Sequence, residues 1–167
     1  MAFGGPVSGS SSGPVTGKAV FPGEQDLIRF ANKFSHHISL PLVIWLEGDL
    51  GAGKTSFARG LIHALGYRGR VKSPTYGLLE HYQLESLKVL HMDLYRISDP
   101  GELEFLGIED LLDERTILLI EWPDKGGSWL PEPDFILTFA YAGEGRDLDW
   151  KACSQRAQSF ATGLHST

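Results

Sequence analysis

A phosphate-binding pattern occupies residues 48–55, which read Gly-Asp-Leu-Gly-Ala-Gly-Lys-Thr and match G-x-x-x-x-G-K-[ST] in full. In such a loop, several backbone N–H groups converge on the phosphates of a nucleoside triphosphate. Gly48, Gly51 and Gly53 reach the backbone conformations that this requires without steric cost. Lys54 would bring positive charge to the β- and γ-phosphates, and Thr55 would offer its hydroxyl to Mg²⁺. The pattern therefore predicts a triphosphate site.

The residues on either side of the loop support this prediction. A continuous apolar run, Leu40–Leu46, precedes it and suits a strand buried on both faces. Apolar residues between Phe57 and Leu65 then recur with helical spacing. The N-terminus of that helix would add unpaired N–H groups and its dipole to the phosphate site. The alternative, a glycine-rich turn with an incidental Lys-Thr pair, does not account for this context.

Two acids stand at the ends of predicted strands, where a P-loop enzyme usually holds its metal. Glu121 ends the apolar run Thr116–Glu121, and Asp93 ends a more mixed run that includes His91. The cleaner strand favours Glu121 as a metal ligand or water-orienting residue. Asp93 would then be a second catalytic or switch acid. Either residue could instead be a solvated acid at a strand end.

Three further residues could act on the nucleotide. Thr75, in Ser-Pro-Thr-Tyr after the predicted helix, occupies the zone where P-loop GTPases sense the γ-phosphate. Trp122 could pack on the metal site, and Arg146, in a glycine-rich turn, could reach phosphate or adenine. Each also has a simpler reading: a proline-directed turn for Thr75, core packing for Trp122 and plain exposure for Arg146.

The base of the expected nucleotide is assigned by excluding guanine. Guanine recognition would need an Asn-Lys-x-Asp run after the loop, but the chain's one Asn-Lys pair, Asn32-Lys33, precedes it. ATP is therefore the expected nucleotide. The histidines show no zinc spacing, so we interpret them as ordinary core or surface residues; we considered His36, His37, His63, His81 and His91.

Composition limits the class of protein. A chain of 167 residues with 42% hydrophobic residues suits one globular domain. The formal charge of −6 lowers the expectation that this chain is itself the main RNA-binding component. Cys153 is the one cysteine, which fits a reducing compartment, and no apolar run approaches membrane-spanning length. We therefore expect a cytoplasmic protein without membrane association.

The chain divides into three predicted parts. Residues 1–17 are rich in Gly, Ser and Pro and predict a flexible leader. Residues 18–155 form the nucleotide-binding domain, and residues 156–167 form a tail in which a helix fades into disorder. The remaining elements expected in the domain are a short strand at 18–21, a helix from Glu24, strands at 76–84 and 88–95, short helical pieces at 100–112, and a strand pair through residues 135–150 with a turn at 143–145.

Several motifs, in this order, resemble the TsaE family. They are Leu46-Glu-Gly-Asp-Leu-Gly-Ala-Gly-Lys-Thr55, Ser73-Pro-Thr-Tyr76, His91-Met-Asp-Leu-Tyr-Arg96, Glu102-Leu-Glu-Phe-Leu-Gly-Ile108 and Ile120-Glu-Trp-Pro123. The first is common to many NTPases, and the later ones are much more specific. The likeness spans residues 23–150.

The resemblance implies an α/β fold: a P-loop NTPase-like, mostly parallel sheet flanked by helices, with antiparallel additions. It implies a Mg²⁺-dependent ATPase, weak alone, that acts on a complex of the TsaB and TsaD proteins during threonylcarbamoyl modification of a tRNA adenosine beside the anticodon. Contact with tRNA would be indirect, through that complex. By position, Thr55 and Glu121 correspond to metal ligands, and Lys54, Asp93 and Glu121 to catalytic residues. The implied nucleotide-binding residues are Leu50, Gly51, Ala52, Gly53, Lys54, Thr55, Ser56, Thr75, Trp122 and Arg146.

One position departs from the family pattern. Gly77 stands where the family usually has a further Thr, which removes a hydroxyl contact.

The alternative function is a self-contained P-loop kinase for a small metabolite. A kinase usually has an arginine-rich lid, but after the predicted helix only Arg68 and Arg70 are candidates for one. A non-catalytic nucleotide sensor would not need two strand-end acids.

Overall fold

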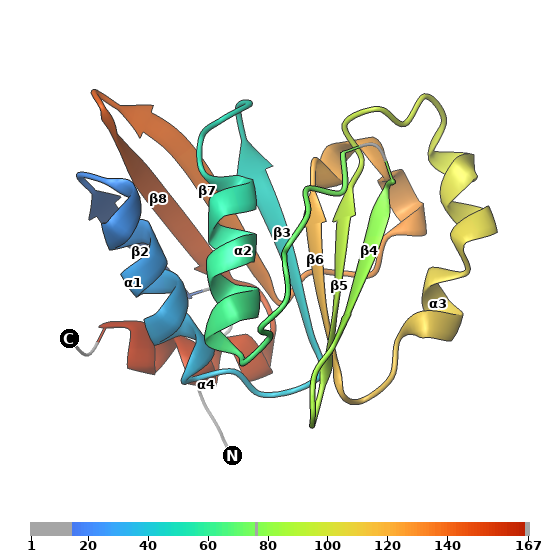
Figure 1. The fold of residues 1–167 in the computed structure, drawn as a ribbon, viewed down its shortest axis with the longest axis horizontal. Helices are drawn as coiled ribbons and strands as arrows, with labels where there is room; N and C mark the ends of the chain where they lie inside the picture. The colour runs from blue at the N-terminus through green and yellow to red at the C-terminus, as the bar shows by residue number, and fades with distance from the viewer. Residues whose placement is uncertain (1–14, 76, 166–167) are drawn as a thin grey trace, which may run out of the picture.

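The computed structural model describes residues 15–75 and 77–165. Within this part, seven strands form one sheet in the order β2-β8-β7-β3-β6-β5-β4 (Figure 1). The strands are β2 (Val15–Phe21), β3 (Leu42–Gly48), β4 (Leu79–Gln83), β5 (Lys88–Asp93), β6 (Thr116–Glu121), β7 (Phe135–Ala142) and β8 (Gly145–Ala152).

The direction of the strands changes from the centre of the sheet to its edges. The four central strands, β7, β3, β6 and β5, are parallel neighbours. The pairs β2–β8, β8–β7 and β4–β5 are antiparallel. The α/β fold class is thus confirmed, although parallel pairing is confined to the centre of a mixed sheet. β6 is buried at every position because both of its faces are covered.

Helices cover one face of the sheet. They are α1 (Glu24–Ser35), α2 (Lys54–Ala64) and α4 (Gln155–His165). α1 is amphipathic and buries Leu27, Ala31 and Phe34. These residues join α2, α4 and one face of the sheet in the larger of two hydrophobic cores.

Short helical pieces cover the other face. They are η2 (Pro100–Leu106), α3 (Ile108–Leu111), η3 (Pro123–Lys125) and η4 (Gly127–Trp129). Leu103 and Ile108 from these pieces pack on Leu90, Leu118 and their neighbours in the smaller core. Figure 1 places this layer at the opposite end of the molecule from β2 and α1.

Three predicted boundaries differ from the structure. β2 begins at Val15, so the last three residues of the predicted leader belong to a strand that pairs with β8; residues 1–14 lie outside the described part. β4 begins at Leu79, not at residue 76, which also lies outside the described part. The helix predicted in the tail is present as α4 and continues to His165, because Phe160 and Leu164 pack in the larger core.

The parallel centre aligns the ends of three strands. Leu46 of β3 lies opposite Glu121 of β6, which in turn lies opposite Asp93 of β5. The loop after β3 therefore emerges beside the two acids predicted from the sequence. Among the described residues, no helix is long and apolar enough to cross a membrane.

We expect Phe34→Ala to cost about 3–5 kcal/mol of unfolding free energy. Its side chain is fully buried. Its ring centroid lies 4.7 Å from that of Phe160, 5.2 Å from that of Phe135 and 5.6 Å from that of Phe57. Truncation removes these contacts and leaves a cavity.

Urea denaturation measures this cost. Phe105→Ala is the matched control, because that side chain is 88% exposed and should change stability by only about 0.5 kcal/mol. Equal effects of the two substitutions would contradict the core assignment.

Candidate nucleotide site

The loop between β3 and α2 depends on its glycines. Gly48, Gly51 and Gly53 have positive φ angles of 137°, 76° and 122°, conformations that residues with a Cβ rarely adopt. At Gly51 space is also limiting, since a Cβ would lie 2.5 Å from the hydroxyl oxygen of Tyr141. That hydroxyl donates a 2.7 Å hydrogen bond to the carbonyl of Leu50. The tip of the loop is thus fixed by a residue of β7.

Lys54 begins α2 and turns back over the loop. Its side chain donates to the carbonyl of Gly48 and, at 3.4 Å, to that of Asp49. Its Nζ also lies 3.7 Å from the ring centroid of Trp122, a cation–π contact. Burial lowers the pKa of the Lys54 ammonium, and the charges of Glu121 and other nearby acids oppose that effect. The ammonium is thus held among acceptors beside the loop.

Thr55 and Glu121 meet at the floor of the site. The Thr55 hydroxyl lies 3.1 Å from each carboxylate oxygen of Glu121. The same carboxylate lies 2.7 Å from Nε2 of His91 on β5. Glu121 and His91 are 2% and 0% exposed, respectively. Glu121 is therefore not a solvated strand-end acid but is held between a hydroxyl and an imidazole.

Asp93 holds a second hydroxyl, one strand further along the sheet. Its Oδ2 accepts a 3.1 Å hydrogen bond from Thr75, and its Oδ1 accepts from the backbone N–H of Tyr95. Thr75 also lies within 2.8 Å of the Ser73 hydroxyl. The segment around Ser73 and Thr75 is thereby tied to the end of β5, next to the Glu121 pair. Gly77, which stands where the family usually has a Thr, is exposed and has no side chain that could contact this segment.

Trp122 turns the chain immediately after Glu121. It has a left-handed φ of 59°, which is rare for a large residue, and its N–H bonds to the carbonyl of Leu46. Its ring lies 5.0 Å from that of Tyr95, between centroids, and faces the Lys54 ammonium. Trp122 thus packs against a neighbouring ring and also lines a cleft with Glu121, and its contact with a metal site stays a prediction.

Arg146 approaches the loop from β8. Its guanidinium carbon lies 4.4 Å from the centroid of the Tyr141 ring, and Nη2 donates to the carbonyl of Gly51 at 3.2 Å. Arg146 is thus not simply an exposed arginine. It borders a pocket of about 310 Å³ on the α1 side of the loop, to which Glu24 and Ser56 also contribute.

The structure brings most of the predicted residues around one cleft. The cleft is lined by Leu50, Gly51, Gly53, Lys54, Thr55, Ser56, Thr75, Asp93, Glu121 and Trp122. Two predicted residues do not line it. Ala52, within the loop, is fully buried, and Arg146 lines the neighbouring pocket.

Two residues of the site were not identified from the sequence. His91 was interpreted as an ordinary histidine, yet it contacts Glu121 directly. Its place two residues before Asp93, on the same face of a strand, was the available signal. Tyr141 was read only as a strand residue, and nothing in its local sequence indicates that it bonds to Leu50.

The oxygen atoms in the cleft suit Mg²⁺. Thr55, Glu121 and Asp93 provide a hydroxyl and two carboxylates, which are the ligand types that this hard cation prefers. Among residues 15–75 and 77–165, no group of three His, Cys, Asp or Glu side chains could hold a metal ion. Mg²⁺ in phosphate sites is usually bound by one or two protein ligands together with phosphate and water oxygens.

The strand, glycine-rich loop, helix and aligned acids together define an α/β protein of the P-loop type. Comparison with known proteins identifies the family. Residues 21–148 match the family model described as threonylcarbamoyl adenosine biosynthesis protein TsaE. The chain belongs to the TsaE family.

Individual relatives agree with this assignment. The chain is 42% identical over 133 residues to the tRNA threonylcarbamoyladenosine biosynthesis protein TsaE of Haemophilus influenzae, covering 77% of this chain and 84% of that protein. It is 36% identical to the Bacillus subtilis protein of the same name, covering 73% and 77%. The crystal structure of Bacillus subtilis YdiB superposes with a TM-score of 0.77 at 25% identity, covering 92% of this chain and 96% of that one.

We expect His91→Leu to impair the site through Glu121. Loss of the imidazole leaves the buried carboxylate without one of its two side-chain partners. By analogy with the partners of metal-ligating groups in other proteins, the nucleotide hydrolysis proposed below should fall about 10–100-fold. Stability should fall by about 1–3 kcal/mol.

Hydrolysis rates and thermal melts on the same samples separate the two effects. His63→Leu is the control, because the His63 side chain is exposed and, among the described residues, its one hydrogen bond is to the Gly69 carbonyl. Unchanged hydrolysis in a folded His91→Leu protein would show that His91 does not position Glu121.

Proposed function

We propose that this chain is a Mg²⁺-dependent ATPase that serves tRNA threonylcarbamoyladenosine synthesis, the pathway named for its family. The observation that carries the proposal is the contact between the Thr55 hydroxyl and the Glu121 carboxylate, 3.1 Å apart. It joins the end of the phosphate loop to a strand-end acid, the combination on which P-loop enzymes rely.

Each residue of the cleft has a distinct part in this proposal. Backbone N–H groups of the loop cradle the phosphates, and Lys54 neutralises their charge. Thr55 and Glu121 hold the cation. Mg²⁺ supplies charge stabilisation at the β- and γ-phosphate oxygens when it is bound. His91 keeps the Glu121 carboxylate in place.

Asp93 and Thr75 form the second half of the site. Their hydrogen bond ties the Ser73–Thr75 segment to β5. We propose that Thr75 responds to the γ-phosphate, as switch segments of P-loop GTPases do, and that Asp93 orients the attacking water. Arg146 and the pocket it borders would receive the remainder of the nucleotide, and ATP is the proposed nucleotide because a guanine-reading motif is absent from the sequence.

The proposed partners are the TsaB and TsaD proteins, and tRNA is reached through them. Hydrolysis by the free chain would be slow, and the complex would stimulate it. A cytoplasmic location, which the single cysteine and the sequence favour, stays a prediction.

We expect phosphate release from ATP to be slow with the chain alone and to rise at least tenfold when TsaB and TsaD are added. That factor corresponds to about 1.4 kcal/mol of barrier lowering. A malachite-green assay with and without EDTA measures it. A lack of stimulation together with phosphate transfer to a nucleoside would instead identify a self-contained kinase.

Two substitutions distinguish the acids. Glu121→Ala should abolish Mg²⁺-dependent tightening of nucleotide binding, whereas Asp93→Ala should leave binding nearly intact and lower hydrolysis by about 100-fold or more. Isothermal titration calorimetry with an ATP analogue, with and without Mg²⁺, measures the nucleotide affinity of each variant. The reverse result would exchange the roles of the two acids.

A further inference from the structure

One segment singled out in the sequence takes no part in the nucleotide site. Residues 99–114 contain η2 and α3 and carry seven carboxylates with no lysine or arginine. Their charge of −7 exceeds the net charge of −6 of the whole chain, so the rest of the chain has a net charge of +1. The acidity of this protein is therefore concentrated in one layer of the fold. The acids are Asp99, Glu102, Glu104, Glu109, Asp110, Asp113 and Glu114.

Large apolar side chains lie among these acids. Phe105 is 88% exposed, the largest exposure among the large apolar side chains of the described part, and Trp129 of η4 is 45% exposed. Trp129 borders a pocket of about 310 Å³ whose floor includes Leu103 and Ile108 and whose rim carries Glu104, Glu109 and Asp110. We call Phe105 and this pocket the η2–α3 surface.

The three rim acids differ from the other acids of the segment in their partners. Asp99 and Glu102 cap η2, and Asp113 pairs with Lys88. In contrast, Glu104, Glu109 and Asp110 form no ion pair among the described residues. An apolar pocket with an unpaired acidic rim fits a partner surface that combines apolar and basic side chains. It does not fit RNA or an anionic membrane, because like charges repel.

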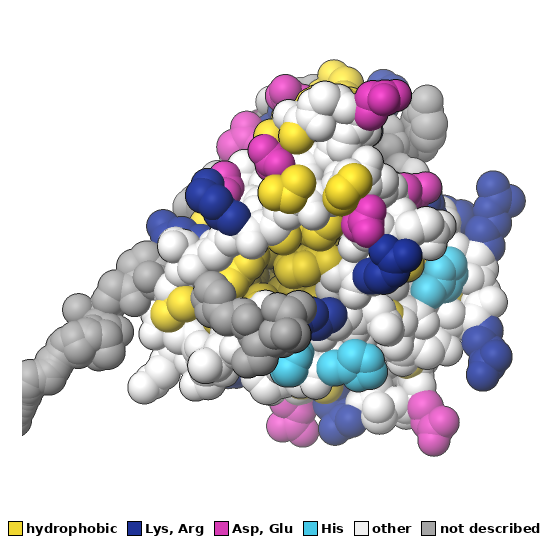
Figure 2. Space-filling view, turned by 90° about the vertical axis from the view of Figure 1, so that its left-hand side faces the viewer, with side chains coloured by type: hydrophobic (Ala, Val, Ile, Leu, Met, Phe, Trp, Pro, Cys, Tyr) yellow, Lys and Arg dark blue, Asp and Glu magenta, His cyan; other side chains and the backbone are white. Residues whose placement is uncertain are grey.

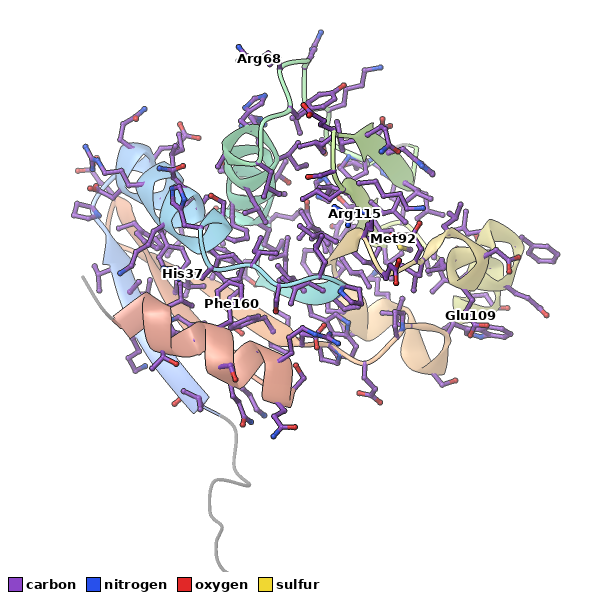
Figure 3. All side chains as sticks on the ribbon, turned by 90° about the horizontal axis from the view of Figure 1, so that it is seen from below. His37, Arg68, Met92, Glu109, Arg115 and Phe160 are labelled. Carbon is purple, nitrogen blue, oxygen red and sulfur yellow. The ribbon has the colours of Figure 1, made fainter. Side chains whose placement is uncertain are left out.

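One other face of the molecule lacks this combination. The side that carries β2 and α1 also shows hydrophobic side chains in a hollow, but acidic and basic side chains are mixed around it (Figure 2). Viewed from below, Glu109 lies at the end of the molecule away from His37 and Phe160 (Figure 3). The single-sign charge is thus a local property of the η2–α3 surface.

The surface is connected to both acids of the nucleotide site. The chain leaves Asp93 at the end of β5 and reaches η2 by way of Tyr95, and it leaves Glu121 at the end of β6 and reaches η3 and η4 by way of Trp122. Tyr95 and Trp122 pack together, 5.0 Å between ring centroids. The Tyr95–Trp122 contact therefore joins the segments that lead to η2 and to η3 and η4, directly beside the two acids.

We propose that the η2–α3 surface docks a basic protein surface, with Phe105 entering an apolar depression on the partner, and that this contact stimulates hydrolysis. The proposal rests on the proposed function, since the partner is taken to be the protein complex that carries out tRNA modification. The TsaB–TsaD complex is therefore the probe.

Biolayer interferometry on immobilised TsaB–TsaD, combined with phosphate release, tests this. Phe105→Ala should weaken binding roughly tenfold or more, as truncation of a central aromatic anchor does, and should reduce stimulation in parallel. Hydrolysis by the free chain and its nucleotide affinity should not change. Raising salt from 50 to 300 mM should weaken wild-type binding.

A charge-matched pair of variants tests the acidic rim. Glu104→Lys with Glu109→Lys should nearly abolish binding. Glu85→Lys with Glu132→Lys, two exposed acids elsewhere, changes net charge by the same amount and should reduce affinity only two- to threefold. Equal losses in the two double variants would overturn local docking in favour of long-range attraction.

Three further outcomes would overturn the docking proposal. Wild-type binding that survives Phe105→Ala and the rim reversal overturns this inference and leaves the proposed function standing. Absence of wild-type binding overturns both. Sedimentation showing a dimer that Phe105→Ala converts to a monomer would assign the surface to a second copy of the chain and overturn the proposal.

Discussion

The structure of the site depends on one contact, the hydrogen bond between the first turn of α2 and the end of β6. Thr55 cannot reach Glu121 unless the loop after β3 turns back tightly, and that turn requires the positive φ angles of its glycines. Glu121 cannot be buried as a carboxylate without partners, so the Thr55 hydroxyl and His91 are both needed. The parallel order of β3, β6 and β5 brings these residues together.

Several ionisable side chains are buried together around this contact. Lys54, at the start of α2, and His91, Asp93 and Glu121, on the C-terminal parts of β5 and β6, are all buried polar residues. Burying so many ionisable groups is costly unless they satisfy one another or a ligand. Trp122 and Tyr95 close the side of the cleft toward the smaller core, which links the site to the layer that holds η2 and α3.

The parts of the site that are local in sequence could be predicted, and the parts that depend on strand register could not. The phosphate loop is eight consecutive residues with a fixed chemistry, and the apolar runs before Asp93 and Glu121 located both acids at strand ends. The spacing of His91 and Asp93 places both on one face of β5. The contact of His91 with Glu121, 30 residues away, also depends on the pairing of β5 with β6, which local spacing does not encode. Tyr141 of β7 likewise contacts Leu50, 91 residues away in the sequence, because β7 pairs with β3.

The fold showed the same division. The buried strands β3 and β6 follow from continuous apolar runs, and the amphipathic helix α1 follows from the helical period of its apolar residues. The antiparallel partner strands were expected, but the extent of β2 and the packing of α4 depend on tertiary contacts with β8 and with Phe34. Local composition, which is poor in large apolar residues before Val15, could not locate that boundary.

The central claim is that Thr55 and Glu121 act together on one Mg²⁺ ion. A double-mutant cycle of Thr55→Ala and Glu121→Gln, read as affinity for a non-hydrolysable ATP analogue, tests it directly. Shared coordination predicts a coupling energy of about 1–3 kcal/mol in Mg²⁺ that falls toward zero in EDTA. Additive effects in Mg²⁺ would contradict the claim.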